Sequence, residues 1–217
     1  MDINLTGTLP SELGRLTTLN NKMLFMGNQL HGTIPSELGL LSNLRDFGVA
    51  FNKLTGTIPT ELGLMTGLGA GRTGPPPGGM PPPGGMPPPG GMPPPGGMPP
   101  PWMPPPGGGR QLEEGFLPPP GKPLAPGLLL NHNLLTGSIP SELGRLSLIF
   151  TLHLQNNQLS GLVPTELDQL TFLQDFNISS NRLLTGTIPS GLCGLESDKP
   201  VFQCTGYLCG CNCTCPS

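Results

Sequence analysis

Six cysteines are the residues of this chain best suited to chemistry, and all of them lie within residues 193–217. They are Cys193, Cys204 and an alternating run, Cys209, Cys211, Cys213 and Cys215. Alternate residues of an extended chain project to one side, so the run could gather thiolates around a soft metal. The other interpretation is a set of disulfides that covers the end of the preceding segment, with the pairing left open. We expect disulfides and no bound metal.

Residues suited to catalysis are sparse elsewhere in the chain. The histidines His31, His132 and His153 occupy different places in the repeat described below, so they are not placed to share a metal. The glutamates recur at one fixed place, which predicts a row on the surface rather than an acid–base pair; they are Glu12, Glu37, Glu61, Glu142 and Glu166. No nucleophile stands beside an ordered base, and the glycine runs adjoin proline, which lacks the N–H groups that cradle phosphate. The sequence therefore predicts neither an enzyme nor a cofactor.

A repeat of about 24 residues positions these side chains. Its clearest mark is a Gly-x-x-Pro segment, which recurs with prolines at Pro10, Pro35, Pro59, Pro140, Pro164 and Pro189. Upstream lies a pattern such as Leu44-x-x-Phe47-x-Val49-x-x-Asn52, which predicts a short strand with Phe47 and Val49 facing inward. The asparagine is placed to satisfy backbone groups buried in the turn. We expect the Ser or Thr after each proline to cap a short helical turn whose leucine points inward.

These motifs resemble the plant-type leucine-rich repeat, L-x-x-L-x-L-x-x-N-x-L-x-G-x-I-P-x-x-L-G, over residues 3–68 and 128–195. The resemblance implies an α/β repeat fold, a curved leucine-rich-repeat solenoid with parallel strands on the concave face. A second short strand layer would lie beside it, formed by the G-x-I-P segment. Family members include receptor ectodomains and secreted inhibitors of cell-wall enzymes, so the resemblance implies a binding function without naming the ligand.

A Pro/Gly/Met-rich segment, residues 69–127, interrupts the repeats with copies of Pro-Pro-Pro-Gly-Gly-Met. We expect it to be disordered, with no core of its own. Leu68 occupies the first apolar site of a strand motif whose next two sites are Leu128 and Leu130, so the interruption falls inside one repeat. One continuous solenoid is the expected result, with two tethered half-solenoids as the alternative. The segment is either a ligand for polyproline-binding domains or, as we expect, a passive expansion or retained intron.

These boundaries divide the chain into four parts. Residues 1–68 form the N-terminal repeats, 69–127 the interrupting segment, 128–192 the C-terminal repeats and 193–217 a cysteine-rich cap or tail. In the first repeat Ile3 replaces the asparagine and no cap precedes it. We expect this open edge to favour self-association.

The composition limits the partners and the location of the protein. A net charge of −3 with 11% charged residues provides no basic surface for nucleic acid. Apolar runs such as residues 127–130 are too short to span a membrane. Clustered cysteines and glycosylation sequons at Asn4, Asn177 and Asn212 favour an extracellular or cell-surface location. The chain starts in mid-repeat without a signal peptide, so we expect a fragment or a truncated gene model.

The function expected from this pattern is non-enzymatic recognition of a protein, peptide or glycan. The candidate residues alternate outward from the predicted strands or flank them; they are Arg45, Asp46, Phe51, His153, Gln155, Asn156, Gln174, Asp175 and Asn177. The alternative is a structural surface-coat or cell-wall protein, with disulfide crosslinks and a passive Pro/Gly spacer.

The disulfide interpretation can be tested directly. We predict that denatured, unreduced protein from an oxidising host contains about zero free thiols, because cysteines of secreted domains pair. Free thiols on all the cysteines, or zinc or copper bound at stoichiometric level, would contradict it.

Overall fold

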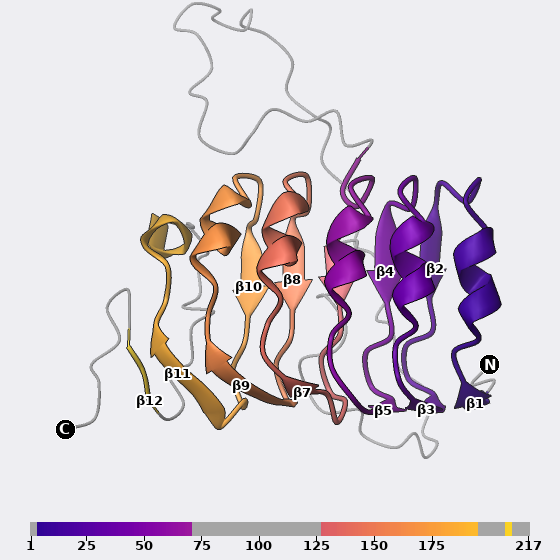
Figure 1. Ribbon diagram of the computed structural model, residues 1–217, viewed down its shortest axis with the longest axis horizontal. Coiled ribbons are helices and arrows are strands. Elements are labelled where there is room, and N and C mark those ends of the chain that lie inside the picture. The colour runs from indigo at the N-terminus through magenta and orange to yellow at the C-terminus, as the bar shows by residue number, and fades with distance from the viewer. Residues whose placement is uncertain (1–3, 71–126, 195–206, 210–217) are drawn as a thin grey trace, which may run out of the picture. The chain divides into compact units, whose positions relative to one another are not determined.

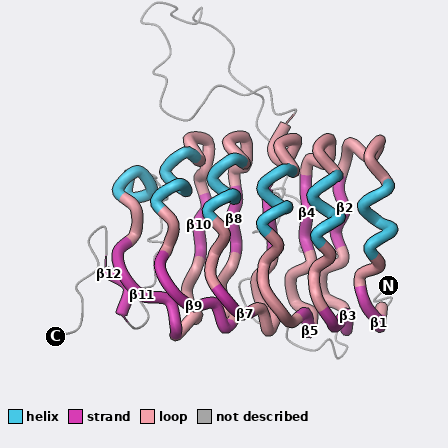
Figure 2. The backbone as a smooth tube through the Cα atoms, in the orientation of Figure 1, coloured by secondary structure: helices cyan, strands magenta, loops and turns pink. Residues whose placement is uncertain are grey.

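Successive repeats lie side by side, and the front of each repeat in the view of Figure 1 is a short 3-10 helix. The computed structural model describes residues 4–70, 127–194 and 207–209. All of these residues belong to one compact unit, which is built from both sides of the interrupting segment. The secondary structure alternates in the same order in successive repeats, as Figure 2 shows.

The principal sheet of the unit is parallel and has five strands in the order β10-β8-β6-β4-β2. The strands are β2 (Lys22–Leu24), β4 (Asp46–Gly48), β6 (Gly127–Leu129), β8 (Thr151–His153) and β10 (Asp175–Asn177). Their register aligns one inward row, Met23, Phe47, Leu128, Leu152 and Phe176. This row belongs to the buried core, so the predicted strand motif is confirmed.

A second layer of parallel strands follows the turns. It comprises β1 (Thr6–Thr8), β3 (Gln29–Gly32), β5 (Lys53–Leu54), β7 (Thr136–Gly137), β9 (Gln158–Leu162), β11 (Leu183–Thr187) and β12 (Tyr207–Cys209). These strands form a three-stranded and a four-stranded sheet, which an isolated bridge between Thr57 and Thr136 connects. The second strand layer implied by the family resemblance is therefore present.

The third element of each repeat is a five-residue 3-10 helix. These helices are η1 (Ser11–Arg15), η2 (Ser36–Leu40), η3 (Thr60–Leu64), η4 (Ser141–Arg145), η5 (Thr165–Gln169) and η6 (Ser190–Gly194). Within the described ranges, no helix is long and apolar enough to cross a membrane. The inward leucine expected in each turn is confirmed, for example at Leu38 and Leu62, which are fully buried.

The predicted capping role of Ser and Thr is wrong for the helices whose caps are described. The residue before η2 is Pro35, with φ −66° and ψ 136°, and no side chain caps the helix. Proline already holds the φ that this extended position needs. The Ser36 hydroxyl instead donates to its neighbour Glu37 at 3.4 Å. Proline geometry, rather than a side-chain cap, therefore starts these helices.

Each repeat packs against the next through a glycine at the end of the helix motif. A Cβ at Gly39 would overlap the backbone carbonyl of Glu61 in the next repeat, and the same overlap recurs at the equivalent glycines. Between the last two repeats the two residue types are exchanged: Asp168 stands in place of the glycine, and Gly191 stands in place of the glutamate of the next repeat. There the Gly191 N–H donates to Asp168 Oδ1 at 3.0 Å. Two linked changes thus preserve the contact.

The asparagine predicted to serve the turn does so across repeats. Asn157 Nδ2 donates to the Leu154 carbonyl of its own repeat at 3.0 Å and to the Leu130 carbonyl of the preceding repeat at 3.1 Å. Its Oδ1 accepts the Leu135 N–H at 3.0 Å. Asn52, Asn133 and Asn181 make the equivalent bonds. The predicted ladder is confirmed.

The second repeat has one residue more than the third, with nine positions from Leu19 to Asn28 against eight from Leu44 to Asn52. Its strand has no bulge, because Met23 pairs with Phe47 and Leu24 with Gly48 in unbroken register. The Asn21 carbonyl already accepts the Arg45 N–H at 2.9 Å, as the equivalent Phe150 carbonyl does for Gln174. The additional residue is therefore accommodated between Leu19 and Asn21, where no ladder bond is broken.

The interrupted repeat closes between two glycines. The Gly69 N–H donates to the Arg45 carbonyl at 2.9 Å, and the Gly127 N–H donates to Asp46 Oδ1 at 3.0 Å. A Cβ at Gly69 would overlap the Leu148 carbonyl, and Gly69 has φ +86°. A Cβ at Gly127 would overlap the Thr151 carbonyl. Gly69 and Gly127 therefore take part in the contacts between repeats, and strand order runs directly from β4 to β6.

Several predictions fall on residues that the structure does not describe. Residues 71–126, with the predicted disorder, lie outside the described residues, as does Asn212. The backbones of Cys193 and Cys209 belong to η6 and β12, but the side chains of all six cysteines lie outside the described part. The disulfide interpretation therefore remains a prediction.

The glycine junction leads to a deletion experiment. Removing residues 70–126 joins Gly69 to Gly127 and restores the spacing of the other repeats. We predict a cooperative unfolding transition with equal or higher stability, by roughly 1–3 kcal/mol at most, because loop closure no longer opposes folding. Urea unfolding followed by circular dichroism measures it.

A deletion of residues 70–127 serves as the matched control. This deletion removes one more residue, which shifts β6 by one position and turns its inward side chains outward. We therefore expect the control to be much less stable. Unfolding of the first variant would show that the removed segment is part of the folded structure.

Candidate functional site

The face of the five-stranded sheet that points away from the core is the candidate site, and we call it the strand face. Its residues alternate with the inward row; along the strands they are Lys22, Leu24, Asp46, Gly48, Gly127, Leu129, Thr151, His153, Asp175 and Asn177. Ala50, Asn131, Gln155 and Ser179 continue it beyond the strand ends. The residues at the motif positions are similar in every repeat, whereas the residues at these outward positions differ from one repeat to the next. Such variation on a regular frame suits recognition.

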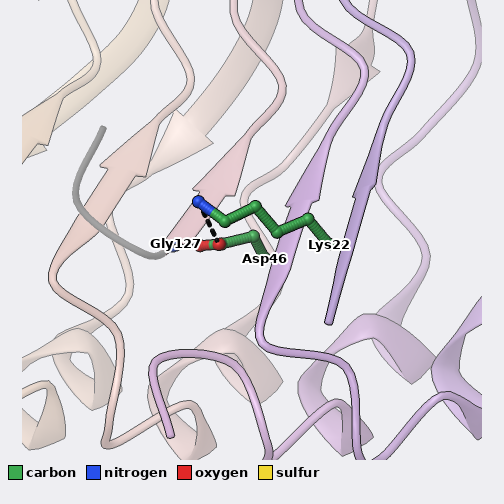
Figure 3. A network of polar contacts seen from close by, with 3 residues as sticks. All are labelled: Lys22, Asp46 and Gly127. Atoms are coloured by element: carbon green, nitrogen blue, oxygen red, sulfur yellow. Dashed lines mark hydrogen bonds and ion pairs between the residues drawn. The ribbon is translucent and has the colours of Figure 1, made fainter. Parts of the chain in front are cut away.

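Asp46, a predicted ligand-binding residue, is held within the fold (Figure 3). Its Oδ1 accepts the Gly127 N–H at 3.0 Å, and its Oδ2 pairs with Lys22 Nζ at 3.1 Å. The Asp46 side chain is 10% exposed, against 49% for Lys22. The carboxylate thus fixes the point where the chain re-enters the sheet, and it is poorly placed to meet a ligand.

The half of the strand face on β8 and β10 carries partly exposed polar side chains, and we call it the open half. His153 Nε2 lies 2.9 Å from Asp175 Oδ2, and these side chains are 22% and 46% exposed. Gln155 lies two residues beyond His153 on the same face and is half-buried. Its Oε1 is buried and has no hydrogen-bond partner among the described residues. The structure therefore brings the predicted residues His153, Gln155 and Asp175 onto neighbouring positions.

A row of side chains follows the strand ends at the edge of this face. Phe51, His132 and Asn156 each precede a ladder asparagine and have φ of 57°, 53° and 55°. The rings of Phe51 and His132 stack with centroids 4.0 Å apart and planes at 14°. His132 Nε2 lies 3.1 Å from Asn156 Nδ2. A left-handed backbone is common for Asn and strained for Phe, so Phe51 is the unusual member of this row.

The remaining predicted residues lie apart from these groups. Arg45 and Gln174 stand at the start of β4 and β10, where their backbone N–H groups bond to the preceding repeat. The nine predicted residues therefore spread along the full length of the strands. His132 was not among them. Its place directly before Asn133, equivalent to Phe51 and Asn156, is the signal that could have identified it.

Asn177 was predicted both as a glycosylation site and as a ligand-binding residue. This half-buried residue lies on the strand face, and its Oδ1 accepts the Ser179 N–H at 3.0 Å. A glycan there would cover the open half of the face, so the two predicted roles exclude each other. Asn4 is exposed, with φ of 46°.

Other features of the described residues offer weaker sites. Open hollows of about 980 and 450 Å³ follow the Pro-Ser/Thr-Glu segments on another side of the repeats. Their lining is the repeated motif itself, so it carries little variation that could select a ligand. In the described ranges, no group of three His, Cys, Asp or Glu side chains could hold a metal ion.

Comparisons with known proteins give the family. The Leucine Rich Repeat model matches residues 149–170 and 172–195. A TDR receptor shares the fold with a TM-score of 0.58 and 28% identity, over 88% of this chain and 23% of the receptor. The Arabidopsis receptor kinase HAESA ectodomain, solved with a peptide hormone ligand, gives 0.59 and 27%, over 88% and 22%. The chain is a plant-type leucine-rich-repeat protein.

This leucine-rich-repeat protein spans under a quarter of the length of those two receptors. A plant ice-binding protein also shares its fold, with a TM-score of 0.54 and 23% identity, over 87% of this chain and 42% of that one. No curated protein matches the sequence. Receptors and an ice-binding protein share this fold, so the fold alone does not identify the ligand, which has to be inferred from the residues of the site.

The role of Asp46 in this leucine-rich-repeat protein leads to a stability prediction. We expect Asp46→Ala to lower the free energy of unfolding by about 1–3 kcal/mol, because the buried Gly127 N–H loses its acceptor. Asp46→Asn keeps an amide oxygen there and loses mainly the Lys22 ion pair, which is worth about 0–1 kcal/mol. Urea unfolding distinguishes them. Equal losses in both variants would show that the ion pair, not the backbone bond, matters.

Proposed function

We propose that this chain is a non-enzymatic binding module, extracellular or at the cell surface, that recognises a peptide or protein through the strand face. The observation that carries the proposal is the open half of that face. There His153 and Asp175 present hydrogen-bonding groups from neighbouring strands, with the half-buried Gln155 beside them. A glycan is the other ligand class compatible with such groups.

The resemblance to receptor ectodomains supports this function. The HAESA ectodomain was solved with a peptide hormone ligand, and it is 27% identical to this chain over the aligned region. The strand face also offers the half-exposed Asp175 carboxylate, which can accept further hydrogen bonds. A rigid frame with variable side chains binds without having to order itself first.

Selection of ligands followed by a matched pair of variants tests the proposal. Peptides would be selected from a displayed random library against the full chain, and their affinity measured by calorimetry. We expect Gln155→Trp to weaken binding at least about tenfold, equivalent to about 1.4 kcal/mol, because the bulky ring covers the strand face.

Gln158→Trp is the control, because Gln158 is exposed on β9 in the second strand layer of the same repeat. Its affinity should stay within about twofold of the unmodified protein, since an exposed change away from the contact has little effect. Binders that respond equally to both substitutions, or to neither, would place the binding surface elsewhere.

A further inference from the structure

The open half of the strand face carries a half-exposed carboxylate, Asp175, and an amide oxygen without a partner among the described residues, Gln155 Oε1. We infer that this half binds a cationic, donor-rich group of the ligand, namely an arginine guanidinium presented to Asp175. The inference rests on the proposed function and names the chemistry of the partner. It follows from three features of β8, β10 and their neighbours.

The first feature is the Asp175 carboxylate itself. It is 46% exposed, and its partner in the described part of the chain is His153 Nε2, at 2.9 Å from Oδ2. The carboxylate can accept several hydrogen bonds, so one neighbour leaves capacity for a ligand. A planar guanidinium presents paired donors that match a carboxylate better than a single ammonium does.

The second feature is the unpaired acceptor of Gln155. Its Oε1 is buried without a hydrogen-bond partner among the described residues. A buried acceptor without a donor is unfavourable, so the Gln155 side chain gains a hydrogen bond if it turns outward to a ligand N–H. Asp175 pairs with Thr151, and Gln155 lies four residues further along the same chain segment. An extended peptide that places arginine at Asp175 therefore meets Gln155 beyond the strand end.

The third feature is the distribution of charge over the strand face. At the N-terminal half Lys22 neutralises Asp46, and Arg45 is exposed nearby, so a cation gains nothing there. β6, the other neighbour of β8, places Leu129 opposite His153. In the described residues, no Lys or Arg side chain pairs with Asp175, so its carboxylate is open to a cation from the ligand.

A pair of small probes tests the inference without knowledge of the natural ligand. N-acetyl-arginine methylamide carries the guanidinium, and N-acetyl-citrulline methylamide has the same shape without the charge. Both would be titrated into the labelled full chain while NMR follows the His153 ring and the Gln155 side-chain amide. We expect saturable shifts with an affinity at least about threefold higher for the arginine probe.

Variants assign the effect to its residues. Asp175→Asn should reduce the affinity for the arginine probe to that for citrulline. Glu61→Gln, which removes an exposed carboxylate on η3, should leave it unchanged. His153→Gln should keep the preference for arginine, because the Asp175 carboxylate remains in place.

Equal affinity for both probes, or a preference that survives Asp175→Asn, would overturn the inference. The proposed function is tested separately. If selected peptides depend on Gln155 but not on Asp175, the strand face binds ligands and only the guanidinium assignment fails.

Discussion

Each repeat turns sharply after its strand, and one asparagine side chain satisfies the backbone groups that the turn buries. The rest of the structure depends on this interaction. Asn133 shows why, because its Nδ2 donates to the Leu130 carbonyl at 3.1 Å and to the Val49 carbonyl at 3.0 Å. One amide thus joins the turn of its own repeat to the backbone of the preceding one. Without this bond, buried carbonyl and N–H groups would be left unpaired, and stacking would be unfavourable.

The same coupling explains how the protein accommodates an interruption inside a repeat. Stability in a repeat stack comes from contacts between nearest neighbours, so the chain between Gly69 and Gly127 need not contribute to it. What matters is that Leu68 and Leu128 both reach the core, which they do. The two glycines and Asp46 adapt the backbone at that position. The strand face consequently continues across the interruption as one surface.

Much of this architecture could be predicted from the sequence, because the repeat imposes the same requirement at every copy. The inward row, the asparagine ladder and the joining of Leu68 to Leu128 follow from spacing alone. The role of the residue after proline was mispredicted because Ser36 is typical of a cap, whereas Pro35 already has the extended backbone. Spacing alone does not locate the extra residue before β2 within the loop, which the register of β2 with β4 does.

The candidate site was less predictable, since it depends on contacts between strands. Alternation placed Asp46 and Asp175 at equivalent positions on the same face. Only the structure shows that Asp46 bonds to Gly127 and Lys22 while Asp175 remains half-exposed beside His153. The stacking of Phe51 on His132 joins residues 81 positions apart in the sequence. No local pattern announces such a contact.

The central claim is that repeats on both sides of the interruption form one stack, and hydrogen exchange at a single amide tests it most directly. The Leu54 N–H donates to Asn133 Oδ1 at 3.0 Å, across the interruption. The Leu159 N–H makes the equivalent bond to Asn181 at 3.0 Å, within the C-terminal repeats. One stack predicts protection of Leu54 within about tenfold of Leu159, because both amides open with the same cooperative unit. Exchange of Leu54 near the rate of an unstructured amide, with Leu159 protected, would mean two separate halves and contradict the account.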